Sequence, residues 1–179
     1  MPTLERLNTA ALRDSVRTFR DTVREHAHGL NRLNVYPVPD GDTGTNMART
    51  LDAVVEEMDA AAHDDHDATC VAISHGSLMG ARGNSGVILS QIMRGFSGTI
   101  RDHADVHGGK FAEALQAAAA GAYDAVLYPI EGTILTVCRV SADAAKAAAD
   151  DGGTVVEVVR AAGVAGSRAL DDWPVLLPV

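Results

Sequence analysis

Two aspartates stand one residue apart in a loop that the chain enters through two prolines, Pro37-Val-Pro-Asp40-Gly-Asp42. Hard divalent cations such as Mg²⁺ take one or two carboxylates together with phosphate oxygens and water. Asp40 and Asp42 are therefore candidate magnesium ligands. Their spacing equally fits two solvated turn aspartates, because Asp-Gly is common turn chemistry. A calcium loop counted from Asp40 is excluded, since its glycine position holds Thr45 and its final carboxylate position holds Leu51.

A glycine-rich turn, Gly80-Ala-Arg-Gly-Asn-Ser-Gly86, precedes apolar residues that recur every four positions at Ile88, Ile92 and Phe96. This spacing predicts a helix that starts at the turn. The free N–H groups and the positive end of a helix dipole favour an anion there, and phosphate is the natural one. The turn has neither the Gly-Lys-Ser/Thr of a Walker loop nor the preceding strand of a Rossmann fingerprint, so a simple capped turn is an alternative.

Together, the aspartate loop and the glycine turn describe a site for a magnesium nucleotide, in which the cation and backbone donors neutralise the phosphates. The segment Glu131-Gly-Thr133 either lines the same cavity or simply starts a helix after Pro129. The remaining candidates are two histidine pairs, which we interpret as solvated, and two cysteines, which we expect as buried small hydrophobic residues. These are His63 with His66, His103 with His107, Cys70 and Cys138.

Helical periodicity dominates the chain, and it predicts an all-α protein of about seven helices with no convincing strand. The expected helices cover residues 12–30, 45–58, 69–80, 88–96, 111–126, 134–149 and 154–170. Three N-terminal signals are specific: Thr9 and Thr133 as N-caps, and a capping box at Thr154-Val-Val-Glu157. Residues 31–44 are expected to form a loop, since two X-Pro steps force extended backbone there.

The chain has 179 residues, of which 46% are hydrophobic, and 15 basic against 24 acidic side chains give a net charge of −9. This is the size of one domain, which buries roughly 70% of its unfolded surface. The acidic balance argues against duplex nucleic acid or an anionic membrane as a partner. No apolar run approaches the roughly 18–20 residues of a spanning helix, so we expect a soluble, cytoplasmic domain without membrane insertion.

Three segments, 33–47, 80–95 and 129–137, closely resemble the nucleotide-binding domain of the bacterial fatty acid kinase catalytic subunit. That domain belongs to the wider dihydroxyacetone kinase nucleotide-binding family, and the resemblance covers essentially the whole chain. It implies an antiparallel barrel of about eight helices. It also implies that ATP or ADP and two Mg²⁺ bind at one end of the barrel, beside the aspartate loop.

The resemblance assigns roles to individual residues. Asp40 and Asp42 match the family's metal-binding and catalytic aspartates, and Asn34 lies near a third metal-binding position. The positions matched to phosphate binding are Thr43, Gly44, Thr45, Asn46, Gly83, Asn84, Ser85 and Gly86. Asp42-Thr43-Gly44 stands where many dihydroxyacetone kinases have Asp-His-Gly, which favours the fatty acid branch of the family.

In that branch, the resemblance implies, a separate fatty-acid-binding carrier protein presents the acyl chain, whose carboxylate attacks the γ-phosphate of ATP to give an acyl phosphate. Full family members carry further domains, so we expect residues 1–179 to be one domain excised from a longer chain, for which binding and turnover are separate questions. A homodimer through the full-length chain is left open. The alternative functions are a dihydroxyacetone kinase subunit and a non-catalytic nucleotide-binding module.

Overall fold

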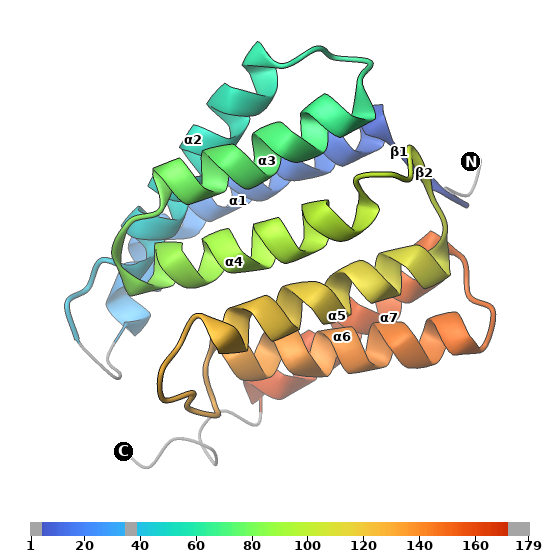
Figure 1. Ribbon diagram of the computed structural model, residues 1–179. Coiled ribbons are helices and arrows are strands. Elements are labelled where there is room, and N and C mark those ends of the chain that lie inside the picture. The colour runs from blue at the N-terminus through green and yellow to red at the C-terminus, as the bar shows by residue number, and fades with distance from the viewer. Residues whose placement is uncertain (1–4, 35–38, 172–179) are drawn as a thin grey trace.

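The computed structural model describes residues 5–34 and 39–171, which form seven helices and one short strand pair (Figure 1). The helices are α1 (Thr9–Leu33), α2 (Thr43–Ala60), α3 (His66–Gly80), α4 (Gly83–Ile100), α5 (Gly108–Asp124), α6 (Ile134–Asp150) and α7 (Val155–Asp171). The strands β1 (Leu7–Asn8) and β2 (Asp105–Val106) pair antiparallel. The all-α class is confirmed. The expectation of no strand is wrong only for this pairing of two residues with two.

Consecutive helices run in opposite directions and pack on one another, α2 also packs on α4, and α7 packs on both α5 and α6. As Figure 1 shows, this order gathers the α1–α2, α3–α4 and α5–α6 connections at one end and the strand pair at the other. In the described part of the chain, α7 does not pack on α1 as consecutive helices pack. The closed barrel of about eight helices therefore stays a prediction.

The main hydrophobic core lies among α1 to α5, and a smaller alanine-rich core joins α5 to α6 and α7. The fully buried large side chains of the main core include Leu51, Met58, Ile73, Leu89 and Ile100. Each contributes about 1.5–3 kcal/mol by leaving water. None of the helices in the described ranges combines the length and apolar composition that crossing a bilayer requires.

Small residues let α4 and α5 approach closely and fix their register. A Cβ placed on Gly95 would lie 2.5 Å from the Ala117 carbonyl oxygen, and one on Gly121 would lie 3.0 Å from that of Gln91. Both contacts are tighter than a side chain tolerates without movement. Glycine is therefore required at Gly95, and the two contacts align the helices antiparallel.

Several helix ends differ from their expected positions. The N-cap of α1 is Asn8, whose Oδ1 accepts from Ala11 N at 2.9 Å, and Thr9 is already helical with its Oγ1 hydrogen-bonded to His66 Nδ1. Helix α1 also continues to Leu33, so the loop expected over 31–44 is shorter. Helix α4 runs through Ser97 to Ile100, and the buried Ser97 hydroxyl donates to the Met93 carbonyl at 2.8 Å.

The other two N-terminal signals are confirmed. Leu135 N donates to the side chain of Thr133 at 3.3 Å at the start of α6. Thr154 N donates to Glu157 Oε2 at 2.8 Å, and Glu157 N donates to Thr154 Oγ1 at 3.4 Å, which is the reciprocal capping box. These helix starts could be predicted from the sequence because each hydrogen bond joins residues within one helical turn.

Candidate functional site

The α1–α2 connection brings an amide and two carboxylates together. Asn34 is the C-cap of α1, and its Nδ2 donates to Asp40 Oδ1 at 2.5 Å. Gly41 follows with a φ of +65°, which favours glycine, and Asp42 occupies the N-cap position of α2. The loop residues 35–38, including Pro37, lie outside the described residues. The three polar side chains predicted as metal ligands are therefore neighbours at the start of α2.

These residues fit a hard divalent cation by their donor chemistry. Among the described residues, neither Asp40 nor Asp42 is part of an ion pair with an arginine, lysine or histidine. In the same ranges, no group of three or more His, Cys, Asp and Glu side chains is placed to hold a metal. A cation at this pair thus takes its other ligands from an amide oxygen, from phosphate or from water, as Mg²⁺ does.

The first turn of α2 is fastened to the end of α1. Thr45 N donates to Asn31 Oδ1 at 3.1 Å, and Asn31 Nδ2 donates to Thr45 Oγ1 at 2.9 Å. A Cβ on Gly44 would overlap the backbone of Ala27, so the two helices touch through backbone atoms there. Asn46 N makes the first helical bond of α2, to the carbonyl of Asp42 at 2.8 Å.

Helix α4 starts directly against this turn. Gly83 has a φ of +59°, and a Cβ on it would overlap the amide of Asn46. One turn on, a Cβ on Gly86 would lie 2.6 Å from Thr50 Oγ1. The Ser85 hydroxyl lies 3.5 Å from the Thr43 carbonyl, a long hydrogen bond. The two glycines therefore allow the first turns of α2 and α4 to meet.

The same two helices differ from the others in how they start. Five of the seven described helices have a side-chain N-cap: Asn8, Asp65, His107, Thr133 and Thr154. At α2 and α4, the N-cap residues Asp42 and Arg82 make no side-chain capping bond. The first N–H groups of a helix need an acceptor, and an anion supplies one. Apart from the Thr45 N–H, which donates to Asn31, the first N–H groups of these two adjacent helices are thus available to phosphate oxygens.

The structure brings every predicted site residue into this one region. They are Asn34, Asp40, Asp42, Thr43, Gly44, Thr45, Asn46, Gly83, Asn84, Ser85 and Gly86. Sequence reasoning missed Asn31, which holds Thr45, and Thr50, against which Gly86 packs. Asn31 stands three residues before Asn34, the C-cap of α1. This helical spacing could not be recognised from the sequence, because it depends on α1 extending to Leu33.

The other candidates have structural partners. His66 is buried, with Nδ1 3.1 Å from Thr9 Oγ1 and Nε2 2.9 Å from the Ile100 carbonyl oxygen. Its interpretation as solvated is wrong, because it links three elements of the core. Both cysteines are free thiols, Cys70 buried and Cys138 half-buried. Burial raises the pKa of Cys70 to about 12 and that of Cys138 to about 11, so both thiols stay protonated.

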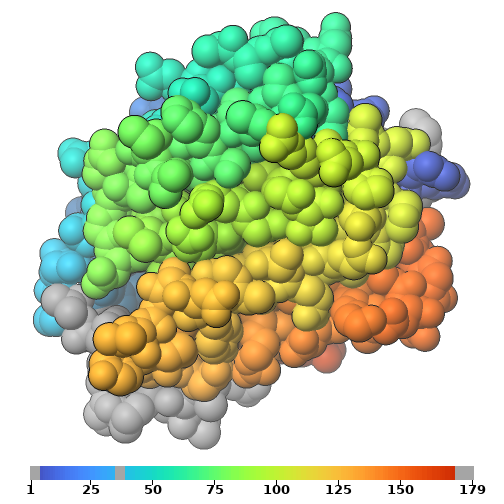
Figure 2. Space-filling model, viewed as in Figure 1, coloured from blue at the N-terminus to red at the C-terminus, as the bar shows by residue number. Residues whose placement is uncertain are grey.

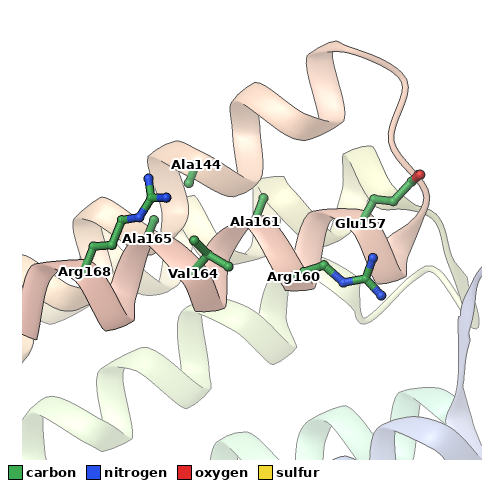
Figure 3. Close-up of a pocket in the computed structure, with 7 residues that line it drawn as sticks. All are labelled: Ala144, Glu157, Arg160, Ala161, Val164, Ala165 and Arg168. Carbon is green, nitrogen blue, oxygen red and sulfur yellow. The ribbon is translucent and has the colours of Figure 1, made fainter.

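Two hollows in the surface of the described residues lie away from this region. A groove of about 430 Å³ runs between α6 and α7, with alanines and Val164 on its floor and Arg160 and Arg168 along α7 (Figure 3). A second hollow of about 760 Å³ lies at the opposite end of the bundle, between the α2–α3 connection and the end of α4. Neither hollow includes a predicted site residue.

Comparison with known proteins shows the family of this chain. Residues 37–179 match the DAK2 domain. The chain is 44% identical over 155 residues to Protein YloV of Bacillus subtilis, a match that covers 87% of this chain and 28% of YloV. It is 40% identical over 176 residues to an uncharacterized protein of Staphylococcus epidermidis, covering 98% of this chain and 32% of that protein. The chain thus spans about a third of the length of these relatives.

Proposed function

Because the chain belongs to the DAK2 domain family, we propose that it is the Mg²⁺-ATP-binding kinase domain of an enzyme that phosphorylates a fatty acid carboxylate. This family includes the dihydroxyacetone kinases, and related domains bind ADP or ATP. One observation carries the proposal for this chain. The two described helices whose N-cap residue makes no side-chain capping bond, α2 and α4, start against each other beside Asp40 and Asp42.

In the proposed complex, the starts of α2 and α4 hold the phosphates and the carboxylates hold the cations. The backbone N–H groups of Thr43, Gly44 and residues 83–85 donate to phosphate oxygens, as helix N-termini do in other phosphate sites. Asp40 and Asp42, with the amide oxygen of Asn34, are the proposed ligands of two Mg²⁺. Bound Mg²⁺ supplies positive charge where the phosphoryl group develops negative charge.

The proposed reaction needs positioning more than acid or base chemistry. An oxygen of the fatty acid carboxylate forms a bond to the γ-phosphorus of ATP. The bond from that phosphorus to the bridging oxygen breaks, and ADP leaves with the electron pair. A carboxylate is already ionised at pH 7, so no side chain has to take a proton. A triose hydroxyl does have to lose one, and Thr43 follows Asp42 where many dihydroxyacetone kinases have histidine.

Nucleotide binding and turnover are separate parts of the proposal. All residues assigned to the nucleotide lie in this chain, so we propose binding for the chain by itself. The chain spans about a third of its relatives, and recognition of a fatty-acid-binding carrier protein is proposed for the whole protein. Acyl transfer is therefore expected from the full-length protein with its carrier.

Thermal unfolding of the chain with MgATP, with MgADP, and with ATP plus EDTA tests the binding part. A ligand at 100 times its dissociation constant stabilises the folded state by about 2.7 kcal/mol. We expect the midpoint to rise only when nucleotide and Mg²⁺ are both present. No rise at millimolar MgATP and MgADP would refute nucleotide binding by this domain.

The acceptor is tested with the full-length protein and ATP labelled at the γ-phosphate. We expect label in an acyl phosphate when a carrier loaded with fatty acid is supplied, and none in dihydroxyacetone phosphate when the triose is supplied. Label in the triose product would assign the dihydroxyacetone kinase reaction. Binding without transfer to either acceptor would assign a non-catalytic nucleotide-binding module.

A further inference from the structure

A network of four polar side chains joins the α5–α6 connection to the helices on both sides of it. Glu131 in the connection accepts from Tyr123 Oη at 2.7 Å, from Thr136 Oγ1 at 2.6 Å and from Arg139 Nη2 at 3.1 Å. Arg139 Nε also donates to Tyr123 Oη at 3.3 Å. We call these four residues the Glu131 latch. Its donors all belong to helices, and its acceptor belongs to the connection.

The latch also fixes the backbone next to Glu131. Gly132 N donates to Thr136 Oγ1 at 2.8 Å, and the same hydroxyl donates to Glu131. Gly132 has a φ of +77°, which glycine adopts without strain. Thr133 is the N-cap of α6 and its hydroxyl donates to the Ile130 carbonyl. The N-cap residue of α6 thus makes a side-chain capping bond, which the N-cap residues of α2 and α4 do not.

The register of α4 and α5 places this connection beside the proposed phosphate site. Gly95 lies on Ala117 and Gly121 lies on Gln91, so residue numbers fall along α5 as they rise along α4. Gly83, the first residue of α4, lies about two helical turns before Gln91. In the same antiparallel register, the start of α4 is therefore level with residues 125–133, which follow Gly121. Figures 1 and 2 show the orange connection at the same end of the molecule as the green α3–α4 turn.

The connection presents apolar side chains at this end. Leu127 and Tyr128 are 85% and 78% exposed, and Val87 in the second turn of α4 is 42% exposed. The positions of Leu127 and Tyr128 depend on the course of residues 125–133, which form no regular helix or strand. The latch is the set of side-chain bonds in the described structure that fastens this segment to α5 and α6.

We propose that Glu131 is a positioning residue, which holds the α5–α6 connection as one wall of the nucleotide site beside the start of α4. This role rests on the proposed function, since it requires the nucleotide to bind between the starts of α2 and α4. Glu131 itself contacts no phosphate in this proposal. Its loss weakens MgATP binding by releasing the wall and leaves every group assigned to the phosphates or to Mg²⁺ in place.

The test compares Glu131→Gln with Asp143→Asn. Asp143 lies 3.8 Å from the other terminal nitrogen of Arg139 but makes no bond to the connection, so it controls for the loss of a charge near Arg139. We expect Glu131→Gln to raise the dissociation constant of MgATP about tenfold, a typical effect of removing a residue that orients a ligand site. Asp143→Asn should bind as wild type. Arg139→Lys, which keeps the cation, should show a smaller loss than Glu131→Gln.

Two further readouts separate positioning from a purely structural role. Amide hydrogen exchange without nucleotide should become faster over residues 126–133 in Glu131→Gln and stay unchanged in α1 and α2. The thermal midpoint of Glu131→Gln without nucleotide should fall at neutral pH, because the ionised Glu131 stabilises the fold, but the variant should remain folded at the temperature of the binding measurement. Slower or unchanged exchange in the connection, or unchanged MgATP affinity despite faster exchange, would overturn the proposal. Absence of MgATP binding by the wild-type chain would instead refute the proposed function, and the positioning role with it.

Discussion

Asn31 at the end of α1 holds Thr45 in the first turn of α2 through both atoms of its amide, at 3.1 Å from Thr45 N and 2.9 Å from Thr45 Oγ1. A backbone N–H can only donate, so Oδ1 of Asn31 must face it. The amide nitrogen of Asn31 must then donate to the Thr45 hydroxyl oxygen. The hydroxyl hydrogen of Thr45 is thereby left to donate to another acceptor, such as a phosphate oxygen.

Replacing Asn31 by alanine tests this clamp. Because both hydrogen bonds are lost, Asn31→Ala should lower the free energy of unfolding by about 1–2 kcal/mol and should weaken MgATP binding. Urea unfolding and nucleotide titration measure the two effects. Asn8→Ala is the control, since it removes the N-cap of α1 at the other end of that helix, at a cost of about 1 kcal/mol, and should leave MgATP affinity unchanged. If Asn31→Ala bound MgATP as tightly as Asn8→Ala, the hydrogen bonds between Asn31 and Thr45 would not shape the nucleotide site.

The two aspartates are tested by removing their charges separately. Asp40→Asn and Asp42→Asn keep the side-chain shape, so stability should change by no more than about 0.5 kcal/mol. Mg²⁺-dependent stabilisation by nucleotide should disappear in each, because the cation loses a carboxylate ligand. Asp64→Asn changes an exposed aspartate in the α2–α3 connection; it is the control and should respond to MgATP like wild type. Wild-type affinity in both Asp40→Asn and Asp42→Asn would refute their role as ligands.

Two glycines of α4 provide a matched pair. Gly83→Ala should lower the free energy of unfolding by about 1–2 kcal/mol or more, because Gly83 has a positive φ and a Cβ would collide with Asn46. Gly98→Ala should raise it by about 0.5–1 kcal/mol, because Gly98 is exposed within the helix with nothing within 4 Å of its Cβ position. Urea unfolding of both variants measures the difference. Equal effects of the two substitutions would contradict the contact between α4 and α2.

The Glu131 latch predicts a pH dependence of stability. Hydrogen bonds from Thr136 and Tyr123, together with Arg139, lower the pKa of Glu131 from 4.5 to about 2. A carboxyl with a lowered folded-state pKa stabilises the protein fully above its unfolded pKa, and this contribution is lost as pH falls from about 4.5 through 2. The stability difference between wild type and Glu131→Gln should therefore be larger at pH 6 than at pH 3, as measured by urea unfolding. A difference that does not shrink in acid would show that Glu131 is not held as an ion in the folded state.

Signals that act within one turn could be predicted from the sequence. The caps Thr133 and Thr154 and the helical period of seven segments depend on neighbours along the chain, and the structure has them. The extension of α1 to Leu33 could not be predicted in this way. It depends on Asn31 meeting Thr45, fourteen positions away, and on Gly44 fitting against Ala27.

The sequence by itself determined the all-α class and, by residue type, which segments can hold a cation or a phosphate. Asp40, Asp42 and the glycines around Gly83 carry that chemistry wherever the fold places them. Only the tertiary structure decided that α2 and α4 start against each other and that Glu131 fastens a third segment at the same end. The physical reason is that such contacts depend on how closely helices pack, and Gly44, Gly83 and Gly86 allow an approach that any side chain would prevent.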